Sequence, residues 1–131
     1  MPRYDDLLAR KGSGTAFDRL EPASPGVLAS LDEYGAAQTD YRDFLRDIGW
    51  GELGSANFML YGGLLDRSDV YGDEALDGEV FLFGDDFSGY CVGFRRADWR
   101  VVELDPRGNP TVIADDFETF IRKLIARLEE A

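Results

Sequence analysis

The stretch EVFLFGDDFSGYCVGF, residues 79–94, followed by WRVVELDPRGNPTVIADDFETFIRKLI, residues 99–125, decides the fold. Its first part holds two short apolar runs, Val80–Phe83 and Tyr90–Phe94, joined by the turn Asp85–Gly89. A connection this short forces the two strands to pair antiparallel. Every position from 80 to 83 is apolar, which predicts a strand that is covered on both faces.

The strand pattern extends to both sides of this hairpin. Arg100–Leu104 and Thr111–Ala114 read as two further strands, separated by the tight Pro/Gly/Asn turn at 105–110. Upstream, Asn57–Tyr61 reads as a strand, which we expect Gly62–Gly63 to end. The strands follow one another without intervening helices, and this order predicts an antiparallel meander.

An amphipathic helix follows the last strand. Apolar residues from Phe117 to Leu128 recur at helical spacing and form a stripe wide enough to bury against a sheet. Asp115 or Asp116 can cap the N-terminus of this helix, and Glu118 stands three residues after the first of them, as in a capping box.

Shorter helices are predicted before the sheet. Tyr4–Lys11 has a helical pattern, and Thr15–Ser24 reads as an irregular arm. Ser24 and Pro25 are suited to cap and begin a second helix, whose apolar positions run to Tyr34. A third helix is expected from Thr39, with Gly49 ending it.

Helices at the ends and strands in one block predict an α+β fold. We expect a curved antiparallel meander sheet, with the N-terminal helices and the C-terminal helix packed on it. The length of 131 residues suits a single domain over 1–131, in which residues 1–24 form the N-terminal helix and arm.

The charge of the chain limits its partners. There are 26 acidic against 14 basic residues, for a net charge of -12. Such a surface repels phosphate backbones and acidic membranes, but attracts a basic protein. Residues 66–86 hold eight of the acids against one base. Neither a membrane-spanning run nor a secretory signal is expected, and the lone cysteine, Cys91, fits a reducing cytoplasm.

Few chemical sites are compatible with these residues. The sequence has no histidine, so Ser-His-Asp and Cys-His catalysis and histidine metal sites are excluded. Gly49, Gly51 and Gly54 match G-x-G-x-x-G, but a helix is predicted before them and a strand after them, the reverse of a dinucleotide site. We therefore interpret them as a loop. Paired carboxylates of a hydrolase and a weak surface cation site remain alternatives without a specific motif.

Several segments resemble the SUKH superfamily of bacterial toxin-immunity proteins and yeast cell-wall regulators. The similar segments are YRDFL at 41–45, FLFGDDFSG at 81–89, VVELD at 101–105 and ADDFETFI at 114–121. The sequence departs from the family pattern at Gln38-Thr39, where Leu-Pro is usual, and at Ile48-Gly49-Trp50, where an Asn-Gly turn is usual. The Gly-Asp that usually follows the acidic turn is Gly89-Tyr90 here.

The resemblance implies a non-enzymatic domain that binds another protein and has no catalytic residues or cofactors. The expected function is that of a cytoplasmic immunity protein which neutralises a basic toxin, such as a nuclease. The alternative is a regulatory or scaffold protein that associates with itself. The predicted partner-binding acids are Asp69, Asp73, Glu74, Asp77, Asp85 and Asp86. Tyr71 and Trp50 are the predicted anchors, although Trp50 also suits a core plug.

Overall fold

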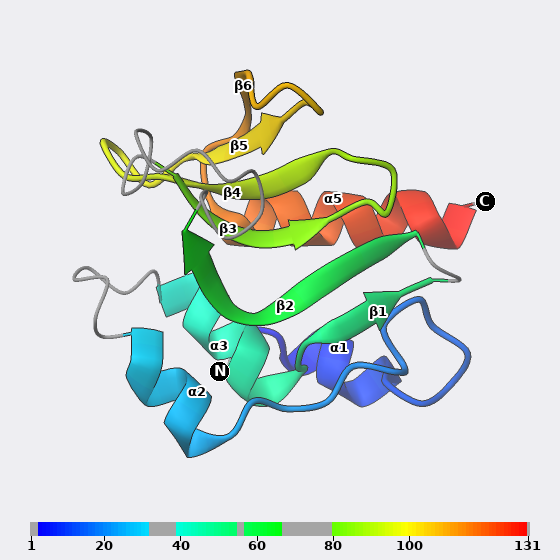
Figure 1. The fold of residues 1–131 in the computed structure, drawn as a ribbon. Coiled ribbons are helices and arrows are strands. Elements are labelled where there is room, and N and C mark those ends of the chain that lie inside the picture. Colours follow the sequence, from blue (N-terminus) through cyan, green and yellow to red (C-terminus); the bar gives the residue numbers. More distant parts are fainter. Residues whose placement is uncertain (1–2, 32–38, 55–56, 67–79, 131) are drawn as a thin grey trace.

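The computed structural model describes residues 3–31, 39–54, 57–66 and 80–130. Three helices come first: α1 (Asp5–Arg10), α2 (Pro25–Ser30) and α3 (Thr39–Asp47). The strands follow, and the C-terminal helix α5 closes the order (Figure 1). The strands are β1 (Gly51–Leu53), β2 (Phe58–Asp66), β3 (Val80–Asp85), β4 (Cys91–Arg95), β5 (Val101–Leu104) and β6 (Pro110–Ala114). Helix α5 spans Phe117–Glu130.

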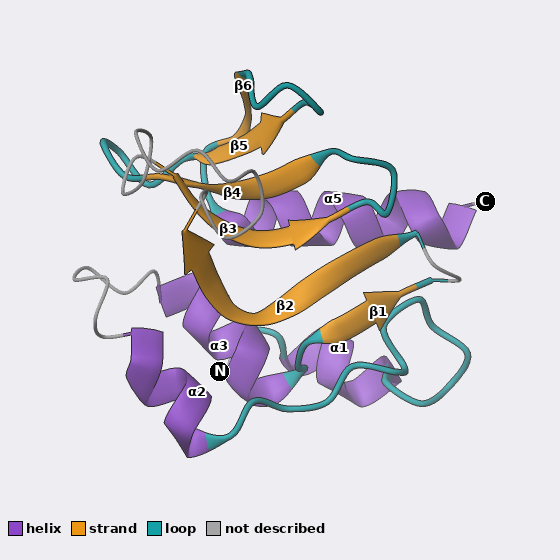
Figure 2. Cartoon of the chain, in the orientation of Figure 1, coloured by secondary structure: helices purple, strands orange, loops and turns teal. Residues whose placement is uncertain are grey.

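These strands form one sheet in the order β1-β2-β3-β4-β5-β6, and each neighbouring pair is antiparallel. The meander and the α+β class are therefore confirmed. Helices α1, α3 and α5 lie behind the sheet, and β2 is strongly curved (Figure 2). No helix among the described residues is both long and apolar enough to cross a bilayer.

The principal core lies between the sheet and the helices. Its centre is aromatic: the ring of Tyr41 from α3 is 5.7 Å from Phe83 of β3, 5.3 Å from Phe94 of β4 and 5.0 Å from Phe117 of α5. Edge-on and tilted contacts between aromatic rings stabilise the fold beyond the contribution of burying their apolar surface. One aromatic cluster thus joins two helices to the two central strands.

A second, smaller cluster is buried on the opposite face. Along β5, Val101 belongs to the principal core, whereas Val102 and Leu104 belong to the second cluster. Neighbouring residues of a strand point to opposite faces, so the two clusters lie on the two sides of the sheet. Leu82 is in the second cluster and Phe83 in the first, which confirms that β3 is buried on both faces.

Two predicted boundaries are wrong. Gly62–Gly63 does not end a strand, because β2 runs through it to Asp66, with a register shift between Leu60 and Leu65. The glycines accommodate the bend: Gly63 has φ of +139°, and Gly62 lies against the ring of Trp50. The predicted loop at 49–54 contains a strand, β1, which pairs with β2.

The helix predictions are confirmed where the chain is described. The hydroxyl of Ser24 accepts from the N–H of Val27, and Pro25 begins α2. The predicted end of this helix at Tyr34 lies outside the described residues. For α5, the capping residue is Asp116, whose Oδ1 accepts from the N–H of Thr119 at 2.7 Å.

Candidate functional site

The β3–β4 turn presents two aromatic rings beside two acidic residues. Phe87 is 52% exposed and Tyr90 is 39% exposed, whereas Asp85 and Asp86 are half-buried. Phe87 has a positive φ of 66°, which is costly for a residue with a bulky side chain. We call residues 85–90 together with the adjoining Asp105 and Pro106 the acidic rim.

Hydrogen bonds of the carboxylates hold this turn. Asp86 Oδ1 accepts from the N–H groups of Ser88 (2.9 Å) and Tyr90 (3.1 Å). Asp85 Oδ1 accepts from the N–H of Phe87 (2.9 Å), and its Oδ2 accepts from the hydroxyl of Tyr61 (2.6 Å). The two carboxylates therefore fix the backbone that presents Phe87.

The turn between β5 and β6 packs beside this one. A methyl group built on Gly89 would lie 3.3 Å from Cγ of Pro106, so the two turns are in contact. Asp105 Oδ1 accepts from the N–H groups of Arg107 and Asn109, both at 2.9 Å. These hydrogen bonds lower the pKa of Asp105 and keep its carboxylate charged, and the bond from the backbone N–H of Asn109 has the largest effect.

Asp85 and Asp86 form no ion pairs with other described residues, although most of the arginines are paired elsewhere. Neither Asp85 nor Asp86 lies within 4.0 Å of a described lysine or arginine nitrogen. The arginines that form ion pairs in the described part of the chain are Arg3, Arg10, Arg19, Arg46, Arg95, Arg100 and Arg122. The negative charge of Asp85 and Asp86 is therefore not offset by a neighbouring cation in this part of the structure.

Burial raises the pKa of Tyr61, and the Asp85 carboxylate beside its hydroxyl raises it further. The phenol therefore stays protonated and remains a donor to Asp85 at any physiological pH. This bond joins β2 to the end of β3 on the sheet face that carries the second cluster. Its physical role is to anchor the rim to the sheet.

The structure describes three of the predicted binding residues: Trp50, Asp85 and Asp86. Asp85 is the last residue of β3, and Asp86 follows it in the turn. Five of the predicted residues lie outside the described part of the chain: Asp69, Tyr71, Asp73, Glu74 and Asp77. Of the predicted acids, the structure therefore describes only the neighbouring pair Asp85 and Asp86.

Trp50 is a packing residue and not part of the rim. Its half-buried indole packs against the principal core and covers Gly62, at whose position a methyl group would come within 3.1 Å of the ring. Its backbone forms a bridge with Glu21, with both N–H to O distances at 3.0 Å. This packing agrees with the core-plug interpretation of Trp50, and its role as an anchor stays a prediction.

The sequence prediction missed the exposed pair Phe87 and Tyr90. The apolar patterns suggested that Tyr90 was the first residue of β4, but β4 begins at Cys91 and the Tyr90 side chain is exposed. A signal was present in Asp-Asp-x-Ser-Gly, because an aromatic in the middle of a tight turn has little chance of burial.

Comparison with known proteins yields no match to a family model, a curated protein or a solved structure. The SUKH resemblance therefore stays a prediction. Within the described residues there is no group of three or more metal-ligating side chains that could hold an ion.

Proposed function

We propose that this chain is a protein-binding domain without enzymatic activity, and that it acts as a cytoplasmic immunity protein against a basic toxin. The observation that carries the proposal is the acidic rim, where exposed Phe87 and Tyr90 stand beside Asp85 and Asp86, which form no ion pair with a described residue. Exposed aromatic residues are common anchors of interfaces. The resemblance to SUKH immunity proteins supports the same function.

The charge of the chain supports a basic partner. A net charge of -12 accelerates the encounter with a cationic surface, such as the phosphate-binding face of a nuclease. Steering of this kind affects the association rate and weakens as salt is added. The aromatic anchors would then hold the complex after encounter, mainly by slowing dissociation.

The test is binding to the protein encoded by the adjoining gene, measured by surface plasmon resonance at low and physiological salt. Asp86→Asn is the sharpest charge variant, because both side-chain hydrogen bonds of Asp86 go to Oδ1 and an amide oxygen can accept them. We expect it to slow association by roughly twofold to threefold at low salt. Asp5→Asn, at an exposed position of α1, removes the same charge away from the rim and should leave the rate unchanged.

Co-expression of this chain with the neighbouring protein tests the immunity function in cells. The neighbouring protein should arrest growth when it is produced alone and should be harmless when this chain is produced with it. A neighbour that neither arrests growth nor binds the chain contradicts the immunity function. Equal effects of Asp86→Asn and Asp5→Asn would show that binding occurs elsewhere on the surface.

A further inference from the structure

The two edges of the sheet differ in how their backbone groups are satisfied. At the β1 edge, the arm at 16–21 runs alongside the strand. Glu21 and Trp50 exchange two backbone hydrogen bonds at 3.0 Å, and the N–H of Gly54 donates to the carbonyl of Ala16 at 2.8 Å. The arm therefore covers the backbone edge of β1.

The β6 edge has no such cover from the described residues. No backbone or side-chain hydrogen bond from these residues reaches β6 from its outer side, and Val112 and Ile113 are 40% and 38% exposed. The N–H of Asp105 donates to the carbonyl of Asn109, so these two residues form a hydrogen-bonded pair at the start of the hairpin. Such pairs recur at every second residue of antiparallel strands. The backbone N–H and C=O of Thr111 therefore point toward β5, and those of Val112 point outward. An exposed apolar edge with an outward N–H at Val112 and outward carbonyl groups can pair with another strand.

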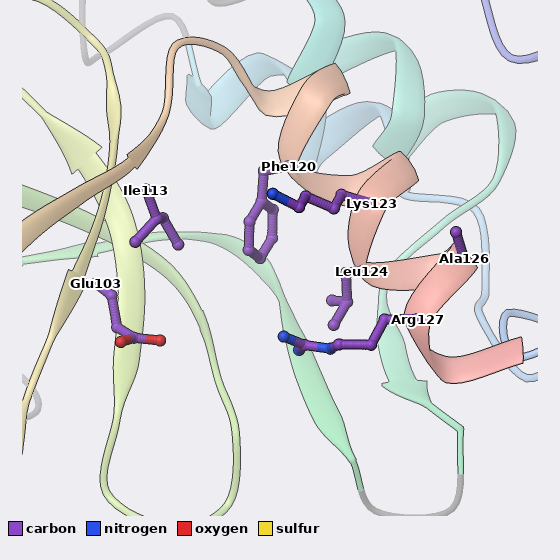
Figure 3. A pocket seen from close by; sticks show the side chains of 7 residues that line it. All are labelled: Glu103, Ile113, Phe120, Lys123, Leu124, Ala126 and Arg127. Carbon is purple, nitrogen blue, oxygen red and sulfur yellow. The ribbon is translucent and has the colours of Figure 1, made fainter. Parts of the chain in front are cut away.

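A groove of about 470 Å³ lies beside this edge, between α5 and the β5–β6 hairpin (Figure 3). Its apolar lining consists of Ile113 from β6 and of Phe120, Leu124 and Ala126 from α5. Three charged residues also line it, Glu103 from β5 and Lys123 and Arg127 from α5. Figure 3 shows the Glu103 carboxylate and the Arg127 guanidinium pointing toward one another from opposite walls.

The two cations of the groove have no acidic partner among the described residues. Lys123 and Arg127 are exposed and lie one helical turn apart, and no ion pair joins either of them to Glu103 or to another described acid. In a chain with 26 acids, this is a local excess of positive charge over an apolar floor. The complementary ligand carries an apolar group beside a carboxylate.

We propose that an extended segment of a partner protein pairs with the free edge of β6, and places an apolar and an acidic side chain in this groove. Alternate side chains of an added strand face the same side of the sheet as Ile113. An apolar residue and an acidic residue two positions apart therefore both face α5, the first over Leu124 and the second between Lys123 and Arg127. This surface is separate from the acidic rim and does not depend on the function proposed for it.

The charges disfavour a second copy of this chain as the occupant. Antiparallel pairing of two β6 strands about a twofold axis would place both α5 helices on one face of the joined sheet. Each copy would then bring Lys123 and Arg127 to that face, while β6 itself offers only Thr111 and Ile113 to the opposite groove. Like charges gather in this arrangement, whereas an acidic segment neutralises them.

The experiment is selection of a displayed library of random short peptides against the intact chain. We expect enriched peptides to alternate apolar and acidic residues, and to slow amide exchange in β6 when they bind. Peptides N-methylated at alternate positions test the edge directly without altering the protein. One register of methylation should abolish binding and the other should be tolerated, because only every second N–H of an added strand points to β6.

Protein variants test the two parts of the site. Val112→Pro removes the outward N–H of β6 and leaves the hydrogen bonds between β5 and β6 intact. It should weaken binding of the selected peptides about tenfold or more. Lys123→Gln combined with Arg127→Gln should weaken acidic peptides about tenfold, and should not affect analogues with Gln in place of the acid. Arg96→Gln is the matched control, since Arg96 is exposed and forms no ion pair with described residues.

Three results overturn the proposal. The first is a library without enriched acidic peptides. The second is binding that tolerates N-methylation in both registers, which would show that no strand pairs with β6. The third is a dimer in sedimentation analysis that Val112→Pro dissociates, which would identify a second copy of the chain as the occupant.

Discussion

The carboxylate of Asp40, in the first turn of α3, accepts a hydrogen bond at 3.0 Å from the backbone N–H of Glu118, in the first turn of α5. Its other oxygen accepts from the N–H of Tyr41 at 2.8 Å. Asp40 is only 7% exposed, and it stabilises the N-terminus of a helix 78 residues away in the sequence. One acid thus joins α3 to α5, two of the helices that pack on the sheet.

Replacing Asp40 by alanine should therefore destabilise the fold strongly. The change leaves the Glu118 N–H without its partner at a part-buried site, and we expect a loss of about 2 kcal/mol in the free energy of unfolding. Urea unfolding followed by circular dichroism measures this loss. Thr39→Ala, at the exposed preceding position, is the control and should change stability by less than about 0.5 kcal/mol.

Phe87→Gly should stabilise the chain while it weakens partner binding. Glycine adopts a φ of +66° without steric cost, and the exposed ring contributes little to the core. We expect a gain of about 1 kcal/mol in the free energy of unfolding, measured in urea. If the ring is an anchor, binding to the proposed partner should weaken by about 2 kcal/mol. A variant that binds as tightly as the wild type would remove Phe87 from the interface.

Asp98 should contribute to the loss of folding stability at acidic pH. The guanidinium of Arg95, 2.5 Å from this carboxylate, lowers its pKa to about 2, below the ordinary value of about 3.9. Because the folded pKa is the lower one, this contribution is complete above about pH 4 and is lost as the pH falls toward 2. Carbon-detected NMR titration measures the value, and Arg95→Gln should raise it toward the ordinary one. An unchanged value in that variant would rule out the arginine as the cause.

Arg122 should control the attachment of α1 to α5. Its guanidinium donates to both carboxylate oxygens of Asp6, at 2.9 and 3.1 Å, and to Glu118 at 2.8 Å. Lysine cannot reproduce this planar set of bonds, so Arg122→Lys should accelerate amide exchange in α1 by about tenfold, with the sheet unchanged. Arg127→Lys on the same helix serves as the control. Equal exchange in both variants would contradict this attachment.

The thiol of Cys91 should be inert in the native protein. It is 4% exposed in the second cluster, and it is the only cysteine of the sequence, so a thiol reagent reports on it alone. We expect reaction with Ellman's reagent to follow opening of the sheet and to become complete in urea. Rapid labelling under native conditions would show that this face opens easily.

The strands and helices with strong periodicity could be predicted from the sequence, because burial alone determines them. Val80–Phe83, the turn after it and the stripe from Phe117 are examples, and each lies within a residue or two of the observed element. β1 could not be predicted. It is three residues long, and its pairing depends on Trp50 and Gly62, which meet only after β2 bends.

The candidate sites, too, could be predicted from the sequence only in part. The acids at 85 and 86 were visible in the sequence as part of a charged turn. The exposure of Phe87 and the groove beside Lys123 depend on tertiary structure. Phe87 is exposed because no other element covers its turn, and the groove forms where α5 and the β5–β6 hairpin leave a space between them. A helix sequence alone assigns Lys123 and Arg127 to the favourable end of the helix dipole, and does not show that an apolar hollow lies between them and β6.

The arm along β1 also limits how far copies of this chain can assemble. Of the two sheet edges, the described residues leave only that of β6 uncovered, and a sheet with one accessible edge accepts one neighbour there and then stops growing. If the arm were cut away or displaced, each molecule would have two accessible edges, and head-to-tail addition would continue into filaments. The few backbone bonds of residues 16–21 at the β1 edge therefore work against open-ended assembly of this kind.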